Sequence, residues 1–502
     1  MITEDQRSEE TGEKQELFFK FSPNNRNNLT QYIKHMKFTI HTILVSIYCL
    51  LQPINAATLQ SSNDNLSDTS KVTCYLYPRL SPESPDYKVK ANKQKVFVYK
   101  TSAAPFAAFS CNGPVTIEIE MPNASKNISI SPLKNGIKPE INGKHVTFRL
   151  PRPMSVVVEV DGFPQLFLYA NPMEANAPSP SDPTVKYFKA GQIYEVGEIK
   201  LKDNETLYIE GGAVVRGCIS STSAKNIRIA GYGILDGGYY RKGIDTRRSI
   251  ELADCRKSVI EDIIMIEPSS WMIVLGACED ITVRNVKELG TVGSTDGADI
   301  VGSKHIHIEN CLFRNGDDCI AIKALDLRKN GTIDYSQDVE DIEIRGCAFL
   351  SYIGGQALEI GHELRTATVK NIRFIDCDIL GIHGYGGVFG IHNSDRAVIS
   401  GILYENIRVE HYYDKLIDFR IIKSRYYKDN ERGQVRDIVL RNIDVAVSPY
   451  NPGYSVSTIG GFDEKHTIEN VLFDNVRLNG VKVVNADQLD LYLKQAFHVQ
   501  FK

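Results

Sequence analysis

The stretch Glu279-Asp280-Ile281-Thr282-Val283 is one copy of the short unit that decides the fold: two polar residues, then two apolar residues flanking a variable one. Copies and close variants of this unit begin at Lys225, Lys257, Glu279, Lys304, Glu340, Lys370, Arg436 and Glu469. Apart from a longer gap between Lys370 and Arg436, they recur at intervals of roughly 22 to 36 residues, the range in which one supersecondary unit stacks on the next. Each copy carries β-branched residues without a helical period, and most lead through Asn, Gly or Asp into a second short apolar strand.

A unit of this size cannot bury its own apolar face, so neighbouring copies must stack and share one elongated core. The repeat therefore predicts a right-handed parallel β-helix. A second antiparallel sandwich is the alternative, but it would not make the same start return in every copy. Residues one coil apart would lie about 4.8 Å apart, so side chains of adjacent coils can form a row along a groove. Long polymers fit such a groove, which by fold analogy favours a polysaccharide ligand.

The preceding segment has a different pattern, in which apolar and polar residues alternate with a period of two. Such runs lie at residues 96–99, 115–120, 145–150 and 156–160, and turn pairs such as Asn142-Gly143 and Asp161-Gly162 lie between them. Alternation at this spacing predicts a β-sandwich over residues 72–171. Residues 171–183 are rich in Pro, Ser and Ala and indicate a domain boundary. We therefore expect an all-β chain: an N-terminal β-sandwich, then a parallel β-helix catalytic domain over residues 184–490.

Composition excludes several classes of protein. The chain has 502 residues with 62 acidic and 58 basic side chains and a net charge of −4, so it carries no electrostatic footprint for nucleic acid. It contains ten cysteines but no Cys-x-x-Cys pair, which disfavours a zinc or redox site. Cys311, Cys347 and Cys377 occupy equivalent places in successive repeats and are expected to fill the core. We expect neither metal nor cofactor, and the oligomeric state stays open.

The first 57 residues resemble an extension followed by a secretory signal. Met36-Lys37 is followed by an apolar run over residues 40–51 and by the small-residue exit Ile54-Asn55-Ala56-Ala57, which is typical of a signal peptide at about residues 36–56. The apolar run is too short to span a bilayer. We therefore expect translation to begin at Met36 and the protein to be secreted or periplasmic, without a membrane span after signal removal. A short membrane anchor is the alternative.

The candidate chemistry lies in two acidic turns, Ser294-Thr-Asp296-Gly297 and Asn315-Gly-Asp317-Asp318. Asp296 and Asp317 are one short coil apart, so they are expected on neighbouring rungs, and Asp318 follows at a turn-like Asn-Gly entry. Like charges that converge repel one another, so one of the three carboxyls should hold a proton. A protonated carboxyl beside ionised ones is what hydrolysis of a glycosidic bond requires. A calcium site or solvated turn acids are the alternatives.

These motifs resemble the glycoside hydrolases of family 28 (polygalacturonases) and the related family 49 (dextranases). Thr295-Asp296-Gly297 followed by Gly316-Asp317-Asp318-Cys319 carries the resemblance, supported by Glu267-Pro-Ser-Ser-Trp271 and Gly233-Ile-Leu-Asp236-Gly237. The resemblance implies a pectin-lyase-like solenoid and an inverting mechanism. It makes Asp317 the general acid, with Asp296 and Asp318 activating the water.

The sequence departs from the polygalacturonase pattern at two places. Gln356 stands where those enzymes carry the histidine of a Gly-His-Gly motif, and the strand 387–392 lacks their Arg-Ile-Lys clamp for a uronic carboxylate. The missing clamp favours a neutral sugar, although Arg420 on a later coil could replace it in part. The residues that we expect to bind substrate are Gln356, Glu359, His362, His392, Arg420, Lys323 and Trp271.

We therefore predict a secreted glycosidase that hydrolyses O-glycosyl bonds of a polysaccharide or oligosaccharide and needs no cofactor. A polysaccharide lyase is one rival, since lyases share this architecture. A non-catalytic carbohydrate-binding β-solenoid is the other.

Overall fold

The computed structural model describes residues 70–327, 333–447 and 456–502, and these lie in one compact unit, residues 68–502. The predicted extension and signal peptide, residues 1–57, lie outside the described residues. Strands and loops make up the described part, together with three single-turn 3₁₀ helices: η1 (Leu133–Asn135), η2 (Gly237–Tyr239) and η3 (Asp487–Leu489). No helix in the described part is long and apolar enough to cross a membrane. The prediction of an all-β chain is confirmed.

The N-terminal region consists of two sheets that enclose an apolar core, as the alternating pattern predicts. One sheet has the order β1-β5-β11-β10-β7, with β4 paired to β5, and the other has the order β3-β2-β6-β9-β8. Pairing is antiparallel except between β5 and β11. The strands are β1 (Val72–Cys74), β2 (Lys88–Ala91), β3 (Gln94–Val96), β4 (Val98–Tyr99), β5 (Phe106–Cys111), β6 (Val115–Glu120), β7 (Ile128–Ser131), β8 (Glu140–Asn142), β9 (His145–Leu150), β10 (Met154–Val160) and β11 (Leu166–Pro172).

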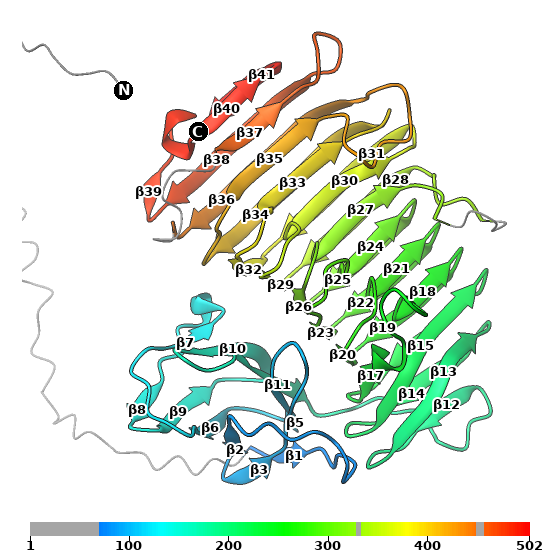
Figure 1. The fold of residues 1–502 in the computed structure, drawn as a ribbon, viewed down its shortest axis with the longest axis vertical. Coiled ribbons are helices and arrows are strands. Elements are labelled where there is room, and N and C mark those ends of the chain that lie inside the picture. The colour runs from blue at the N-terminus through cyan, green and yellow to red at the C-terminus, as the bar shows by residue number, and fades with distance from the viewer. Residues whose placement is uncertain (1–69, 328–332, 448–455) are drawn as a thin grey trace, which may run out of the picture. The chain divides into compact units, whose positions relative to one another are not determined.

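The remaining strands form a parallel β-helix with three rows, which Figure 1 shows as stacked arrows. The first row is β12 (Val185–Phe188), β14 (Thr206–Ile209), β16 (Arg228–Ala230), β19 (Arg256–Glu261), β22 (Glu279–Arg284), β25 (Lys304–Glu309), β28 (Val339–Arg345), β31 (Thr368–Ile375), β34 (Val398–Val409), β36 (Gln434–Val445), β38 (Ile468–Leu478) and β41 (Ala496–Phe501). The second row is β13 (Ile193–Leu201), β15 (Val214–Thr222), β18 (Ile250–Ala253), β21 (Ile273–Gly276), β24 (Ala298–Val301), β27 (Ile320–Ala324), β30 (Leu358–Leu364), β33 (Gly387–Asn393), β35 (Lys415–Ile421), β37 (Ser457–Gly460) and β40 (Leu491–Lys494). The third row is β17 (Ile234–Asp236), β20 (Ile264–Ile266), β23 (Lys287–Leu289), β26 (Leu312–Asn315), β29 (Ala348–Ser351) and β32 (Asp378–Ile382), and β39 (Val481–Lys482) pairs antiparallel with β38.

The repeated sequence unit corresponds to the first row of strands. Its second polar residue adopts a left-handed backbone in successive coils, with φ of 58° at Asp280, 57° at Asp341 and 57° at Asn371. Asn and Asp tolerate this conformation better than most other residues. The small polar residue of the unit therefore marks a left-handed position within the first half of these first-row strands.

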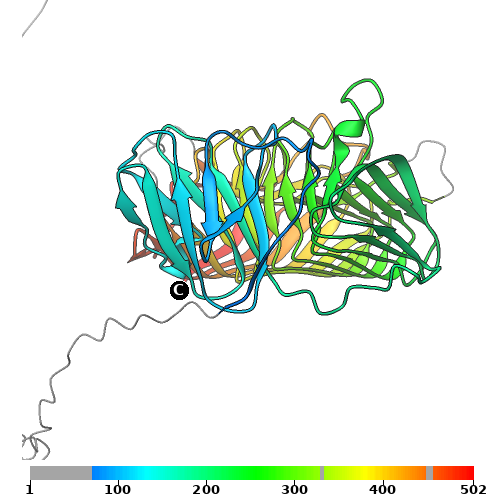
Figure 2. The same ribbon diagram turned by 90° about the horizontal axis from the view of Figure 1, so that it is seen from below.

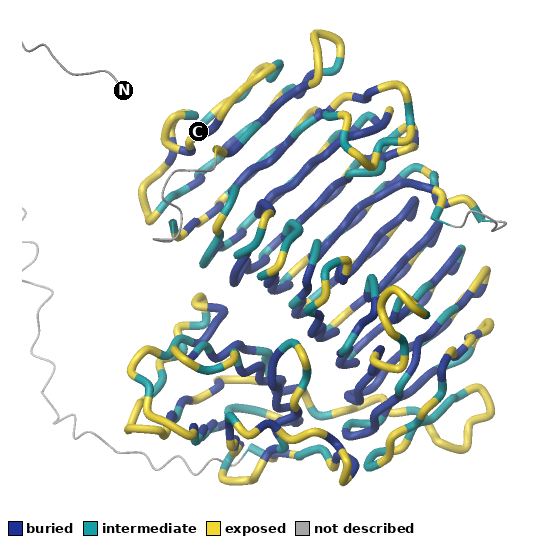
Figure 3. Tube along the Cα trace, in the orientation of Figure 1, coloured by how far each residue is buried: buried dark blue, intermediate teal, exposed yellow. Residues whose placement is uncertain are grey.

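Side chains in the second row alternate between the core and the outer surface, and this alternation positions the candidate site. Ile300, Ile322 and Ile360 point into one continuous apolar core, and Figure 3 shows buried residues following the strands of every coil. Residues next to them point outward, among them Lys323 and Glu359. Cys311, Cys347 and Cys377 are buried thiols of the same core, as expected.

The N-terminal sheets pack against the third row of the β-helix (Figures 1 and 2). Phe167 and Tyr169 of β11 share an apolar cluster with Leu289 and Leu312. Lys134 of η1 forms an ion pair of 2.6 Å with the buried Asp378 of β32. The sequence boundary at residues 171–183 stays a prediction, because residues 68–502 form one unit.

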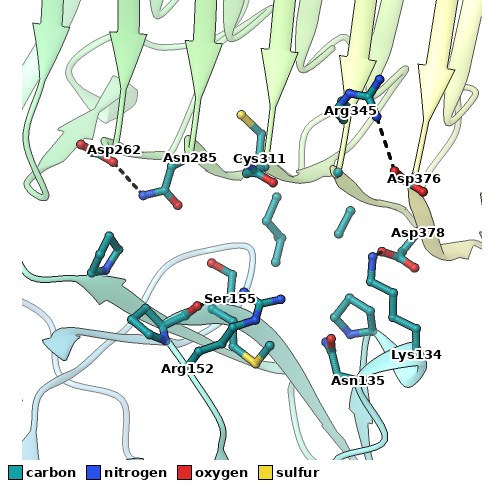
Figure 4. A pocket seen from close by; sticks show the side chains of 18 residues that line it. Lys134, Asn135, Arg152, Ser155, Asp262, Asn285, Cys311, Arg345, Asp376 and Asp378 are labelled. Atoms are coloured by element: carbon teal, nitrogen blue, oxygen red, sulfur yellow. Dashed lines mark hydrogen bonds and ion pairs between the residues drawn. The ribbon is translucent and has the colours of Figure 1, made fainter. Parts of the chain in front are cut away.

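A cleft of about 620 Å³ remains between the sheets and the turns of the β-helix (Figure 4). Several of its polar groups bind one another: Lys134 pairs with Asp378, Arg345 with Asp376, and Asn285 donates to Asp262. These partners hold the lining together and make it a structural interface.

Candidate functional site

Two neighbouring turns bring the three candidate aspartates together. Asp296 precedes β24, and Asp317 and Asp318 lie between β26 and β27. The two strands are paired with an offset of 22 residues, Ala298 opposite Ile320, so Asp296 aligns with Asp318. This corrects by one residue the expected alignment of Asp296 with Asp317, because the Asn-Gly entry adds a residue to the coil.

Backbone hydrogen bonds hold these turns. Ser294 N–H donates to Asp317 Oδ2 (3.0 Å), and Gln356 N–H of the next coil donates to Asp318 Oδ1 (2.6 Å). Gly355 has a φ of +80°, and a Cβ there would lie 2.3 Å from the Asp317 carbonyl carbon. Only glycine fits this close approach, so the third coil packs its backbone directly against the aspartate pair.

Lys323 of β27 is the cation of the site. Its Nζ lies 2.8 Å from Asp296 Oδ2 and 2.6 Å from Asp299 Oδ1, and all three side chains are at least nine-tenths buried. Burial alone would lower the pKa of Lys323, but the carboxylates of Asp296 and Asp299 outweigh it and raise that pKa well above its usual value. Lys323 is therefore charged throughout the working pH range. We call Asp296, Asp299, Asp317, Asp318 and Lys323 the aspartate cluster.

Two carboxyls of this cluster, Asp317 and Asp318, favour the protonated form. Burial, followed by the charge of Asp296, raises the pKa of Asp317. Burial and the same neighbour raise the pKa of Asp318 well above its usual value. Four carboxyls share one cation, so they cannot all ionise together in a buried site.

The cluster opens into a pocket of about 370 Å³. Seven of the ten residues predicted for the site line it: Trp271, Asp296, Asp317, Asp318, Lys323, Gln356 and His362. Trp271 also lies against Lys323, with Nζ 4.0 Å from its ring centroid, so one ring face is occupied by this cation. The side-chain oxygen of Gln356 accepts from Gly387 N–H, which fixes the orientation of its amide.

The other three predicted residues, Glu359, His392 and Arg420, are not among the lining residues and lie behind His362. The His392 ring joins Glu359 Oε1 (Nδ1, 2.8 Å) to Asp418 Oδ2 (Nε2, 3.2 Å), and Arg420 donates to Asp418 (2.7 Å). Glu359, His392 and Asp418 are buried and the Arg420 side chain is 38% exposed, so a chain of ion pairs stands where surface subsites were expected. We call Glu359, His362, His392, Asp418 and Arg420 the histidine cluster.

The two histidines of this cluster have opposite charge preferences. Burial alone would lower the pKa of His392, but Glu359 and Asp418 raise it to about 9. Burial lowers the pKa of His362 to about 4. His362 stacks on His392 with ring centroids 4.4 Å apart, so a neutral imidazole faces the pocket and an imidazolium lies behind it.

Glu359, His362 and His392 are also the residues that could hold a metal, since their ligand atoms lie within 4.8 Å of one another. The arrangement does not fit one well. The two rings are only 10° from parallel, so their in-plane lone pairs do not converge, and both nitrogens of His392 already face carboxylates.

The pocket also contains residues that the sequence prediction missed. They are Ser294, Gly355, Glu363, Tyr385, Arg425 and Tyr426. Tyr385 is 88% exposed at the pocket, and the Arg425 guanidinium lies 4.7 Å from the Tyr426 ring centroid. Both tyrosines lie in loops, whose sequences have no periodicity. The Gly384-Tyr385-Gly386 sequence could have indicated an exposed loop at Tyr385, and Tyr426 has no comparable signal.

Comparison with known proteins finds relatives that match parts of this chain and a solved structure of the same fold. A polygalacturonase of Chamaecyparis obtusa is 39% identical over 72 residues, 14% of either chain. An exopolygalacturonase of Platanus acerifolia is 24% identical over 28% of this chain and 45% of its own. The matches thus span less than half the length of these relatives. Dex49A from Penicillium minioluteum has the same fold, with a TM-score of 0.64 at 13% identity over 84% of this chain and 96% of its own.

A family match covers most of the β-helix. The sequence model of the glycosyl hydrolases family 28 matches residues 175–488, which include both acidic turns and the pocket. The chain belongs to glycosyl hydrolases family 28.

Proposed function

We propose that the protein hydrolyses O-glycosidic bonds of a polysaccharide in the pocket of the aspartate cluster. The observation that carries the proposal is the pocket itself, where Asp296, Asp317 and Asp318 converge beside one lysine. Family membership and the polygalacturonase relatives support the same reaction class.

Asp317 is the proposed general acid. Its raised pKa favours a proton at the start of the reaction, and its Oδ2 accepts the Ser294 N–H over 3.0 Å. Proton transfer from Asp317 to the leaving glycosidic oxygen would accompany attack of a water held by Asp296 and Asp318. The water gives its proton to one of these two carboxylates, and the Lys323 Nζ lies 2.8 Å from Asp296 Oδ2. Direct attack by water inverts the anomeric centre, as the family resemblance implies.

The decisive experiment compares Asp317→Asn with Asp437→Asn, an exposed turn aspartate on β36 that serves as matched control. Asp317→Asn should lower release of reducing ends at least about 100-fold without changing the thermal midpoint, and Asp437→Asn should leave both unchanged. Unchanged turnover in Asp317→Asn would reject the assignment.

The nature of the sugar depends on the cations that reach the pocket. Lys323 is neutralised by two carboxylates and Arg420 is paired with Asp418, which favours an uncharged sugar. Arg425 lines the pocket and is the cation that a uronic carboxylate would meet. Turnover of dextran and other neutral glycans should be compared with turnover of polygalacturonate, which distinguishes an uncharged substrate from a uronic one. An increase in KM for polygalacturonate alone in Arg425→Gln would identify a uronic substrate.

Product analysis separates the rival functions. Unsaturated ends that absorb in the ultraviolet would identify a lyase. Sugar binding without any reducing ends, unchanged in Asp317→Asn, would identify a binding solenoid.

A polysaccharide substrate fits secretion, and we propose that the signal peptide at about residues 36–56 is removed. N-terminal sequencing of the exported protein tests this.

A further inference from the structure

Glu288 is a carboxyl group inside the apolar core of the β-helix, directly behind the aspartate cluster. It lies on β23 between Met265 of the preceding coil and Phe313 of the next, and both neighbours belong to the apolar core. Glu288 is 0% exposed. A carboxylate in such surroundings costs several kcal/mol unless it is paired, so an apolar residue would be the default at this position.

Its hydrogen-bonding partner is the side-chain amide of Asn315, which is itself 1% exposed. Asn315 Nδ2 donates to Glu288 Oε2 over 2.9 Å. The two remaining oxygens, Glu288 Oε1 and Asn315 Oδ1, are both buried without a hydrogen-bond partner. Both are acceptors, so they can satisfy one another only if a proton lies between them.

We propose that Glu288 is a neutral carboxylic acid that forms a two-hydrogen-bond pair with the Asn315 amide, and that this pair positions the catalytic turns. The second hydrogen bond runs from the Glu288 hydroxyl to Asn315 Oδ1, which satisfies both orphan oxygens. Burial also raises the pKa of Glu288 to about 8, which favours the neutral acid. The other titratable group that faces Glu288 is the buried thiol of Cys319.

The pair touches both turns that carry the proposed catalytic residues. Asn315 directly precedes Gly316-Asp317-Asp318, and a Cβ at Gly297, next to Asp296, would lie 2.9 Å from Glu288 Oε2. A substitution at residue 288 that removes the hydrogen bonds to Asn315 would leave the Asn315 amide without this partner, and the two turns would shift. Small displacements of this kind are costly for catalysis.

The positioning role rests on the proposed function, whereas the protonation state does not. The first experiment is therefore independent of activity: carboxyl ¹³C NMR of the whole protein labelled at glutamate, with Glu288→Gln to assign the signal. We expect a protonated Glu288 carboxyl at pH 6, and an ionised one would overturn the proposal.

The second experiment compares Glu288→Gln with Glu288→Leu. Glutamine can accept from Asn315 and donate to it, so kcat should stay within about threefold of wild type, while Glu288→Leu should lower kcat about tenfold or more with KM little changed. Equal kcat losses in both variants would contradict the proposal. If Glu288→Leu fails to fold, Asn315→Leu replaces it, and wild-type kcat in that variant would overturn the positioning role. The catalytic assignment is tested separately by Asp317→Asn. If that variant keeps its activity, the proposed function fails, whatever the Glu288 variants show.

Discussion

The aspartate cluster and the histidine cluster lie on adjacent coils of the same strand row but differ in their charge balance. In the histidine cluster, two carboxylates, Glu359 and Asp418, face two cations, His392 and Arg420. In the aspartate cluster, Lys323 binds Asp296 and Asp299, and the same single cation also acts on the carboxyls of Asp317 and Asp318. A balanced buried chain can remain rigid and dry, whereas an excess of carboxyls at an open pocket leaves one of them holding a proton that can be transferred.

The largest effect on stability is expected from removing Lys323, the single cation of the aspartate cluster. Lys323→Met should lower the free energy of unfolding by about 3–5 kcal/mol, because Asp296 and Asp299 would be left buried without a partner. Urea denaturation measures this, and turnover should fall as well. Lys370→Met removes an exposed partner of Glu340 and should leave the free energy of unfolding nearly unchanged, because exposed ion pairs contribute little. Equal effects of the two substitutions would mean that Lys323 is not the charge that balances the cluster.

The histidine cluster should instead make the stability of the protein depend on pH. The pKa of His392 is raised to about 9 in the folded protein, above the value of about 6.5 in an unfolded chain. Its stabilisation is therefore complete below about pH 6.5 and is lost as pH rises through about 9, on the order of 3 kcal/mol in all. Thermal midpoints between pH 6 and 10 should fall in the wild type.

His392→Gln is the matched variant for this pH dependence. It should be less stable at pH 6 and should show a flatter midpoint between pH 6 and 10. Glu359, Asp418, Arg420 and His362 all face residue 392, so a slope that survives in His392→Gln would assign the titration to one of these neighbours.

The contrast between the two clusters also marks the limit of sequence reasoning. The spacing of the polar-Ile units predicted the coils, and the two acidic turns predicted residues that line one pocket. The sequence predicted Glu359, His392 and Arg420 as substrate-binding residues, but it could not tell that they bind one another's neighbours, with His392 between Glu359 and Asp418 and Arg420 on Asp418.

The sequence analysis also missed Glu288, because its segment resembles an exposed strand. Val286-Lys-Glu-Leu289 reads as a polar surface strand, yet Lys287 contacts Asn171 of the N-terminal sheets over 2.7 Å and Glu288 faces the core. The hydrophobic pattern of this segment does not show that the N-terminal sheets cover Lys287, nor that the core accepts the polar side chain of Glu288 between Met265 and Phe313. Charged residues that become buried in this way carry no signal in their own segment.

The smallest effect is expected where the two clusters meet, at His362. Its pKa is lowered to about 4, so it should stay neutral above about pH 5 and serve the sugar as a hydrogen-bonding group only. His362→Gln keeps such a group and should raise KM about two- to tenfold, the worth of one hydrogen bond, with kcat nearly unchanged. Steady-state kinetics from pH 5 to 8 measure this. A large fall in kcat, or an activity profile that loses an ionisation near neutral pH, would instead make His362 an acid or base of the reaction and join the two clusters into one catalytic unit.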